Sequence, residues 1–384
     1  MPPAMEGLAW HRSLKVALVH DSFTQWGGAE RVAMVLHEMF PEAPIYTLAV
    51  DRAVLPDAMV CAEFRPSFAQ RLPGMPALSA YRRHLPVLPA AARRLRPRGY
   101  DLVISSSSSF AHAADVPGER HVAYIHNTMR FAWDYQDYVA GMGWPAPLRT
   151  AGAVAASWLR AWDRRAGSRP GRLVANSSTV ARRIRERWGR NAEVVPPPVD
   201  VDRVPPGPDS GRRGFCVVTR LVPYKRVDLA IAAANLGGEP LTVVGDGVDI
   251  ARLRALAGPT VTFAGALSER EKQSVVGHAE ALVVPGVEDF GMAPVEANAA
   301  GTPVVAVAAG GVLDSQLDGA TAVLVREQTP DAFLLAMRAV RDRAWTRSAV
   351  RQHAMGFGVD AFRRRMLSVV GDALGPRRHP EASG

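Results

Sequence analysis

The sequence predicts an α/β protein of two Rossmann-like domains, each a doubly wound parallel sheet, and three observations lead to this fold class. The chain has 384 residues, more than the roughly 250–300 that one hydrophobic core usually organises. Short apolar runs alternate with segments of helical spacing in both halves, as expected where helices connect parallel strands. Proline-rich stretches near residue 200 separate the halves. Because such sheets bind ligands outside the carboxyl ends of their strands, we expect two domains facing across a cleft.

The first domain is predicted over residues 14–202. Leu14–Val19 has the continuous apolar character of a buried strand, and Ala29–Phe40 follows it with apolar residues at helical spacing. Further strands are expected at Ile45–Val50, Leu102–Ile104, Val122–Ile125 and Leu173–Ala175. The serine run Ser105–Ser109 is expected to form a plain polar loop after one of these strands, and a loop that faces the acceptor is the alternative.

The second domain is predicted over residues 203–350, beyond Pro196–Pro198 and Pro205–Pro208. A helix is expected at Val227–Ala234. Strands are expected at Phe215–Val218, Leu241–Val244, Val261–Phe263, Ala281–Val284 and Pro303–Val307. Residues 351–384 are predicted to contribute a helix, Ala361–Val370, that crosses back to the first domain, followed by a flexible tail.

Charge is unevenly distributed along the chain, whose formal net charge is +9. Residues 1–200 contain 25 Lys and Arg against 17 Asp and Glu (+8), whereas residues 201–384 contain 21 against 20 (+1). Such basic segments suit an anionic membrane surface, a nucleic acid or an acidic substrate, and solvated helix faces are the alternative. Nucleic acid is disfavoured because aromatic residues do not interleave with the basic runs. Peripheral contact with an anionic membrane therefore stands as a hypothesis, and no nucleic-acid partner is expected.

Cysteine content and hydropathy restrict the class of protein further. Cys61 and Cys216 are far apart in sequence, so neither a disulfide framework nor a cysteine-based metal site is expected. No run of about 18 apolar residues predicts a membrane span, and Met1–Arg12 lacks the apolar stretch of a secretory signal. These features predict a cytoplasmic protein, in peripheral contact with the inner face of the plasma membrane under the hypothesis above.

A candidate anion site lies directly after the predicted strand Ala281–Val284. Pro294 suits the first turn of a helix that ends near Gly301, and the N-terminus of such a helix binds anions through free backbone N–H groups and the helix dipole. The N–H donors expected here are those of Phe290, Gly291, Met292 and Ala293.

Two carboxylates, Glu288 and Glu296, flank this helix N-terminus in the sequence. Carboxylates repel phosphate, so their expected partners are hydroxyl groups. N–H groups for a diphosphate and carboxylates for sugar hydroxyls together suit a nucleotide sugar. The alternative is that Glu288 is solvated and Glu296 only complements the helix dipole.

Arg220 and Lys225 follow the first strand of the second domain, where both are expected to neutralise a diphosphate leaving group. Surface decoration is the alternative. Lysine is scarce, since the chain contains only Lys15, Lys225 and Lys272, and this favours a specific role.

These motifs resemble the retaining, nucleotide-sugar-dependent glycosyltransferases of family 4, which have the GT-B fold. The family's two glutamates, separated by seven residues, are matched by Glu288 and Glu296, and its Arg and Lys pair by Arg220 and Lys225. The resemblance extends from about residue 14 to residue 370. It implies that Glu288 contacts donor-sugar hydroxyls, Glu296 holds the ribose, and Arg220 and Lys225 bind the diphosphate.

The resemblance also reaches the first domain. It implies that Gly27 and Gly28 form the Gly-rich loop beneath the pyrophosphate, with a plain tight turn as the alternative. It places His126 near the donor sugar and acceptor, where a structural histidine is the alternative. In the second domain it assigns Gly265 and Leu267 to the nucleotide base.

The wording of residues 27–32 and 124–134 is closest to bacterial mannosyltransferases of O-antigen and exopolysaccharide assembly. This resemblance implies GDP-mannose as donor and a lipid-linked or saccharide acceptor. No cofactor or metal is expected, since Asp200-Val201-Asp202 lacks the strand-end context of a metal motif. A nucleotide-sugar epimerase of the same fold and a non-catalytic basic protein that binds membranes or nucleic acid are the alternatives.

Overall fold

The computed structural model describes residues 13–139 and 145–375, and its compact packing divides the chain into two units. The first unit extends to Pro198 and resumes at Phe362, and the second extends from Val199 to Ala361. Met1–Arg12 and the end of the expected tail, residues 376–384, lie outside the described residues. Domain boundaries at residues 202 and 350 stay predictions.

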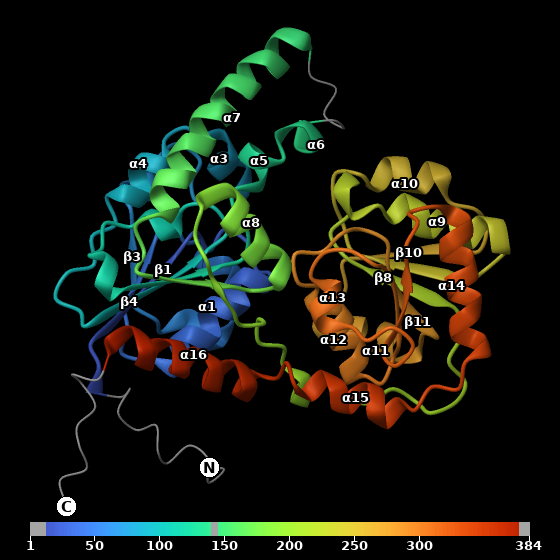
Figure 1. The fold of residues 1–384 in the computed structure, drawn as a ribbon. Coiled ribbons are helices and arrows are strands. Elements are labelled where there is room, and N and C mark those ends of the chain that lie inside the picture. The colour runs from blue at the N-terminus through green and yellow to red at the C-terminus, as the bar shows by residue number, and fades with distance from the viewer. Residues whose placement is uncertain (1–12, 140–144, 376–384) are drawn as a thin grey trace, which may run out of the picture. The chain divides into compact units, whose positions relative to one another are not determined.

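The first unit contains a seven-stranded sheet in the order β3-β2-β1-β4-β5-β6-β7, and every neighbouring pair is parallel (Figure 1). Its strands are β1 (Val16–His20), β2 (Ile45–Thr47), β3 (Phe64–Pro66), β4 (Leu102–Ser107), β5 (His121–Ile125), β6 (Arg172–Ala175) and β7 (Glu193–Val194). Its helices are α1 (Gly28–Met39), α2 (Asp57–Val60), α3 (Leu78–Arg83), α4 (Leu88–Arg93), α5 (Arg130–Trp133), α6 (Tyr135–Val139), α7 (Ala146–Gly167), α8 (Ser178–Trp188) and α16 (Val359–Leu374). One-turn 3-10 helices lie at η2 (Arg52–Val54), η3 (Phe68–Arg71), η4 (Ala111–Ala113) and η5 (Gly118–Arg120).

Apolar residues on both faces of this sheet explain why it is covered on both sides. Ala17, Val19 and Val103 pack with α4, α5 and α7 on one face. On the other face lie α1 and α16, where the Phe362 ring meets Tyr124 of β5 at 5.7 Å (Figure 1).

The serine run of the first unit corrects one prediction. Ser105, Ser106 and Ser107 belong to β4 and are fully buried, so they are not part of a polar loop. Each hydroxyl hydrogen-bonds to the ring of a different histidine, which satisfies a polar group that a buried strand would otherwise leave without a partner.

The second unit contains a six-stranded parallel sheet in the order β10-β9-β8-β11-β12-β13. Its strands are β8 (Phe215–Val218), β9 (Leu241–Val244), β10 (Val261–Gly265), β11 (Ala281–Val284), β12 (Val304–Val307) and β13 (Ala322–Val325). Its helices are α9 (Val227–Gly237), α10 (Ile250–Leu256), α11 (Glu269–His278), α12 (Met292–Ala299), α13 (Val312–Ser315), α14 (Pro330–Asp342) and α15 (Arg347–Met355), with 3-10 turns η6 (Val201–Arg203) and η7 (Pro223–Lys225).

Alternate residues of the same strands form two separate cores in this unit. Val217 and Val283 pack against α9, α10 and α14, whereas Cys216 and Leu282 pack against α11, α12 and α13. This period of two, with apolar residues on both faces, is the pattern of a doubly wound sheet, and the predicted fold class is confirmed. No helix among the described residues is both long and apolar enough to span a bilayer.

Candidate active site

The segment after β8 carries two of the predicted ligands, and a tyrosine lies between them. Arg220 is exposed and its guanidinium donates to the Tyr224 hydroxyl at 3.3 Å. The ammonium nitrogen of Lys225 lies 5.5 Å from the centroid of the Tyr224 ring. Sequence reasoning did not single out Tyr224, whose place between two cations follows from the tight turn η7.

Lys225 and Glu288, both predicted to bind one substrate, lie in direct contact with each other. The Lys225 ammonium donates to both carboxylate oxygens of Glu288 at 2.6 Å. The two residues come from the loops after β8 and β11, which are neighbouring strands of the sheet. Their side chains are only 15% and 18% exposed, so water screens this pair less than a surface pair.

Close backbone contacts hold the Glu288 loop in place. A Cβ at Gly286 would lie 2.7 Å from the carbonyl oxygen of Lys225, so only glycine allows these two loops to approach. On the other side, Gly310 has a φ of +78° and forms a β-bridge with Glu288, and the Gly311 N–H donates to the Glu288 carbonyl at 2.8 Å. The carboxylate therefore projects from a braced loop.

The helix after this loop offers fewer groups to an anion than the sequence predicts. Gly291, with a φ of +90°, caps α12, which begins at Met292. The Phe290 ring is buried, with its centroid 5.7 Å from that of Phe357, so only its backbone is available to a ligand. Pro294 occupies the first turn and has no N–H, which leaves Met292 and Ala293 as the donors of that turn.

Glu296 has a partner that sequence reasoning missed. The Lys272 ammonium of α11 lies 3.3 Å from the Glu296 carboxylate and 2.8 Å from Glu269. The scarcity of lysine was the available signal for Lys272. The cavity beside this pair is about 10 Å³, room for about one water molecule, so it is not itself a nucleotide pocket.

Gly265 and Leu267 lie at the same carboxyl edge of the second sheet, at its outer strand. Gly265 ends β10 with a φ of +71°, and its carbonyl accepts the N–H of Gly245 at 2.8 Å. Leu267 directly precedes Ser268, the capping residue of α11. The predicted residues of this unit thus lie at or after the ends of β8, β10 or β11, and Lys225 and Glu288 are in direct contact.

In the first unit, the two predicted glycines begin α1. Gly27 is the capping residue and Gly28 the first residue of the helix. Glu30, in the first turn, is buried at 5% exposure. A carboxylate at this place complements the helix dipole and competes with any anion there.

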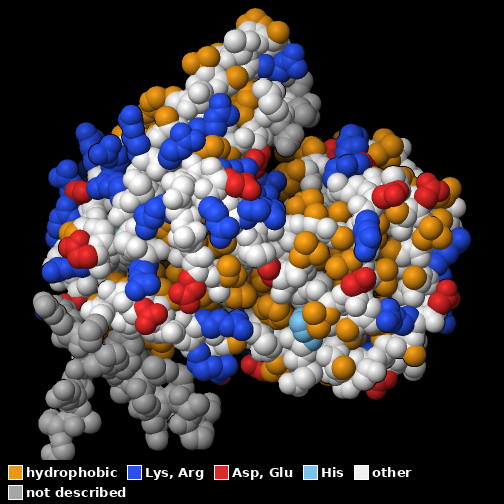
Figure 2. Space-filling model, in the orientation of Figure 1, with side chains coloured by type: hydrophobic (Ala, Val, Ile, Leu, Met, Phe, Trp, Pro, Cys, Tyr) orange, Lys and Arg blue, Asp and Glu red, His pale blue; other side chains and the backbone are white. Residues whose placement is uncertain are grey.

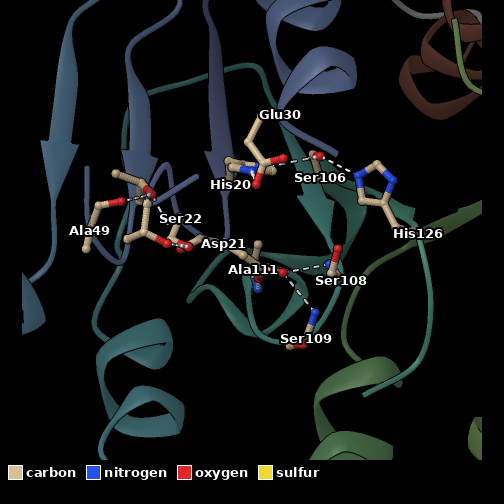
Figure 3. A network of polar contacts seen from close by, with 12 residues as sticks. His20, Asp21, Ser22, Glu30, Ala49, Ser106, Ser108, Ser109, Ala111 and His126 are labelled. Atoms are coloured by element: carbon tan, nitrogen blue, oxygen red, sulfur yellow. Dashed lines mark hydrogen bonds and ion pairs between the residues drawn. The ribbon is translucent and has the colours of Figure 1, made fainter. Parts of the chain in front are cut away.

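His126 ends a chain of polar contacts (Figure 3). Its Nε2 lies 2.8 Å from the Ser106 hydroxyl, which lies 3.1 Å from His20 Nδ1, and His20 Nε2 lies 3.9 Å from Glu30. Burial, and then the neighbouring His20, lower the pKa of His126 to about 3. The imidazole is therefore neutral near pH 7 and is held by the strand beside it.

A buried carboxylate below this chain organises the loop after β4. The Asp21 carboxylate accepts the backbone N–H groups of residues 108–111 at 2.5 to 2.8 Å (Figure 3). Such a carboxylate closes the start of η4 as a capping residue closes a helix. Neither the role of Asp21 nor its hydrogen bonds to this loop were predicted.

A Ser–His–Asp arrangement in this unit is structural. Ser107 Oγ lies 2.9 Å from His112 Nδ1, and His112 Nε2 lies 3.3 Å from Asp163. All three side chains are at most 2% exposed, so no substrate reaches the hydroxyl. Asp163 also accepts the indole N–H groups of Trp133 and Trp188, each at 2.7 Å, and so fastens α7 to the unit.

Two all-parallel sheets with polar residues at their carboxyl edges define a GT-B protein, and solved structures share this fold. HepE from Anabaena superposes with a TM-score of 0.67 at 17% identity, covering 93% of this chain and 99% of that one. Sucrose-phosphate synthase from Thermosynechococcus elongatus gives a TM-score of 0.69 at 17% identity, covering 92% and 98%. At these identities the likeness shows the fold.

Family models identify the chain more closely. Residues 26–203 match the model described as Glycosyltransferase Family 4, and residues 199–354 match Glycosyl transferases group 1. The chain belongs to the family 4 glycosyltransferases, as its motifs predicted.

Curated relatives are named D-inositol 3-phosphate glycosyltransferase. That of Geodermatophilus obscurus is 33% identical over 225 residues, 48% of this chain and 49% of the relative. That of Mycobacterium tuberculosis is 30% identical over 269 residues, 61% and 53%. The chain matches about half the length of these relatives, whose names specify inositol phosphate and not mannose.

Proposed function

We propose that this protein is a retaining glycosyltransferase that moves a hexose from a nucleoside diphosphate sugar to a saccharide or lipid-linked acceptor. The contact between Lys225 and Glu288 carries the proposal, because it joins a cation suited to phosphate with a carboxylate suited to sugar hydroxyls. Glu288 precedes Gly291, the capping residue of α12, by three residues, and the N–H groups at the start of such a helix favour an anion. Family membership supports the same chemistry.

In this reaction the bond between the anomeric carbon and the diphosphate oxygen breaks, and a bond to the acceptor oxygen forms on the same face. The leaving phosphate takes the acceptor proton. Lys225, Arg220 and the N–H groups of Met292 and Ala293 stabilise the charge that develops on the diphosphate. Glu288 accepts hydrogen bonds from the sugar, and Lys225 exchanges part of its contact with Glu288 for phosphate.

The remaining assignments follow from the resemblance. Glu296 binds the ribose hydroxyls, Gly265 and Leu267 face the base, and Gly27 and Gly28 serve the pyrophosphate. His126 serves the reacting sugar as a neutral hydrogen-bonding group, in keeping with its lowered pKa. The proposed reaction uses no metal ion, and the protein is proposed to work in peripheral contact with an anionic membrane.

Our proposed donor is GDP-mannose, from the wording of residues 27–32 and 124–134. A UDP-hexose is the second candidate, because HepE is described in complex with UDP and glucose. Inositol phosphate belongs among the acceptors tested, because the curated relatives are named for it.

A thermal-shift panel of nucleotide sugars and bare nucleotides tests the donor. A ligand at about 100 times its Kd stabilises the folded state by about 2.7 kcal/mol, which raises Tm by a few degrees. We expect GDP-mannose to raise Tm the most. Transfer of a radiolabelled sugar from this donor to an acceptor is the second measurement. No shift with any nucleotide sugar would overturn the proposal, and isomerisation of the donor without acceptor would identify an epimerase.

A further inference from the structure

A cavity of about 190 Å³ in the second unit is lined by four arginines. We name it the arginine pocket. Its charged lining residues are Asp209, Arg212, Glu280, Arg341, Arg343 and Arg347. The cavity is far larger than the roughly 10–15 Å³ that one water molecule needs, so it has room for a small ligand.

The arginine pocket lies at the amino edge of the second sheet. Arg212 precedes the start of β8 by three residues, and Glu280 directly precedes β11. Because the strands of this sheet are parallel, their first residues lie at one edge and their last residues at the other. Lys225 and Glu288 follow the last residues of β8 and β11, so a strand length separates the pocket from the candidate active site.

Arg212 is a buried positive charge whose hydrogen-bond partners are all neutral. The residue is 8% exposed. Its guanidinium donates to the Pro208 carbonyl at 2.7 Å, to the Ala300 carbonyl at 3.1 Å and to the Thr302 hydroxyl. No carboxylate among the described residues forms an ion pair with it. Arginine is rarely buried without an anionic partner, because removal of its charge from water is costly.

Arg343 and Arg347 line the same pocket, and neither forms an ion pair in the part of the chain that the structure describes. Arg347 Nη1 donates to the Gly301 carbonyl at 3.0 Å. The Arg343 guanidinium lies 5.4 Å from the centroid of the Trp345 ring. Burial, and then repulsion from Arg347, lower the pKa of Arg212 to about 10, so Arg212 is still charged at neutral pH and is repelled by its neighbour.

The charges of the arginine pocket leave a positive excess. Arg341 is neutralised by Glu280, whose carboxylate accepts its guanidinium at 2.7 Å. Asp209 is exposed and favours the charged forms of Arg212 and Arg347 without an ion pair to either. Three arginines thus face one carboxylate, an excess of two positive charges. A phosphate group carries about 1.5 to 2 negative charges near pH 7, and its oxygens accept the forked N–H groups of guanidinium.

This excess is local, because the second half of the chain is nearly neutral. Residues 201–384, which include almost all of the second unit, contain 21 Lys and Arg against 20 Asp and Glu. Figure 2 shows acidic and basic side chains interspersed on the face of this unit that is in view. A general surplus of arginine therefore does not explain the arginine pocket.

We propose that the arginine pocket binds the phosphate group of a small molecule, with Arg343 and Arg347 donating to its oxygens beside the fixed charge of Arg212. Inorganic phosphate and a phosphate ester share this chemistry. The inference goes beyond the proposed function and does not depend on it, because the pocket lies at the opposite edge of the sheet from Lys225 and Glu288.

Isothermal titration calorimetry of the full chain tests the pocket, with inorganic phosphate and glucose 6-phosphate as separate probes in a phosphate-free buffer. Wild type should bind at least one of them. R343Q/R347Q, which removes the two proposed donors, should bind it at least about tenfold more weakly. R254Q/R338Q is the matched control, because it removes the same charge from exposed positions of the same unit outside the pocket, and it should bind as wild type.

R343Q alone keeps the proposal testable if circular dichroism shows that the double variant does not fold. The Arg343 side chain is exposed and donates no hydrogen bond to another described residue, so R343Q should fold as wild type and still bind phosphate more weakly. Wild-type affinity in R343Q/R347Q and in R343Q would overturn the pocket.

The remaining outcomes also decide the proposal. No binding of either probe by wild type, or an equal loss in R254Q/R338Q and R343Q/R347Q, overturns it. Lys225→Ala should bind the probes as wild type, and a loss confined to this variant would assign the phosphate to the candidate active site instead. Tighter binding of phosphate identifies the inorganic anion as the ligand and tighter binding of glucose 6-phosphate identifies an ester, and either result supports the pocket.

Discussion

The carboxyl edges of the two sheets carry polar residues of different kinds. In the second unit, Lys225 and Glu288 bind each other across two loops at 2.6 Å. In the first unit, serine hydroxyls bind histidine rings, and Asp21 binds backbone N–H groups. In the second unit, the charged groups can exchange their contact with each other for contacts with a ligand. In the first unit, the polar contacts stabilise the fold.

The difference follows from the hydrogen bonds that would be lost at Lys225 and at Asp21. Lys225 can move from a carboxylate to a phosphate and keep a charge-assisted hydrogen bond throughout. Asp21 is 7% exposed and bound to four N–H groups of one loop, so its removal leaves buried donors without acceptors. Substitutions should therefore separate stability from catalysis, unit by unit.

The largest expected effect is on stability, from Asp21→Ala. Loss of an acceptor for four buried N–H groups should lower the free energy of unfolding of the first unit by about 3–5 kcal/mol. Urea denaturation followed by tryptophan fluorescence measures this unit, because seven of the eight tryptophans precede residue 198.

Asp51→Ala is the matched control, since the Asp51 carboxylate accepts one backbone N–H, that of Ala53 at 3.0 Å. It should cost about 1 kcal/mol. The donor thermal shift, which reports the second unit, should survive in both variants. Equal losses in the two variants would refute the structural role given to Asp21.

The next effect is on turnover, from Lys225→Ala and Glu288→Ala. Each should lower kcat by about 100-fold, and at least tenfold, because each removes a group that stabilises the transition state. The double variant should fall little further, since the two groups act together. Initial rates of sugar transfer at saturating donor measure the effect.

Arg338→Ala is the control for this pair. Arg338 is 51% exposed and lies 3.6 Å from Glu239, an ion pair of the same unit far from the β8 and β11 loops in sequence. It should retain wild-type turnover, and circular dichroism should show all variants folded. Near-normal turnover in both Lys225→Ala and Glu288→Ala would remove the proposed site.

The sequence predicted the strands more reliably than it predicted the contacts between side chains. Phe215–Val218, Leu241–Val244 and Ala281–Val284 form as predicted, because a buried parallel strand is a continuous apolar run. β4 extends through Ser107 against prediction, because histidine rings outside the strand satisfy its hydroxyls. The strand β3 (Phe64–Pro66) is short and partly polar, so its sequence gives no such signal.

The candidate site divides in the same way. Arg220, Lys225, Glu288 and Glu296 were predicted from their types and spacing, since each follows a strand end or lies one turn into the next helix. Their partners Tyr224 and Lys272 were not, because pairing depends on where a loop or a helix face turns in space. A motif thus locates charged groups, but the fold decides which charges neutralise one another.

The smallest expected effect is a pH dependence of the free energy of unfolding, which tests the structural role of the buried histidines. Burial, and then repulsion from His112 and Arg169, lower the pKa of His121 to about 3, against 6.5 for an ordinary histidine. Between these values the unfolded state binds a proton that the folded state does not, so stability is complete above pH 6.5 and falls as the pH falls. The slope is about 1.4 kcal/mol per pH unit for this group.

Urea denaturation of the first unit at pH 6.5, 5.5 and 4.5 tests this prediction. His121→Asn, which can still hydrogen-bond to Ser105, should lower the slope by the contribution of one proton. His278→Asn changes a residue of the second unit and should leave the slope of the first unit unchanged. An unaltered slope in His121→Asn would contradict a buried, neutral imidazole at this position.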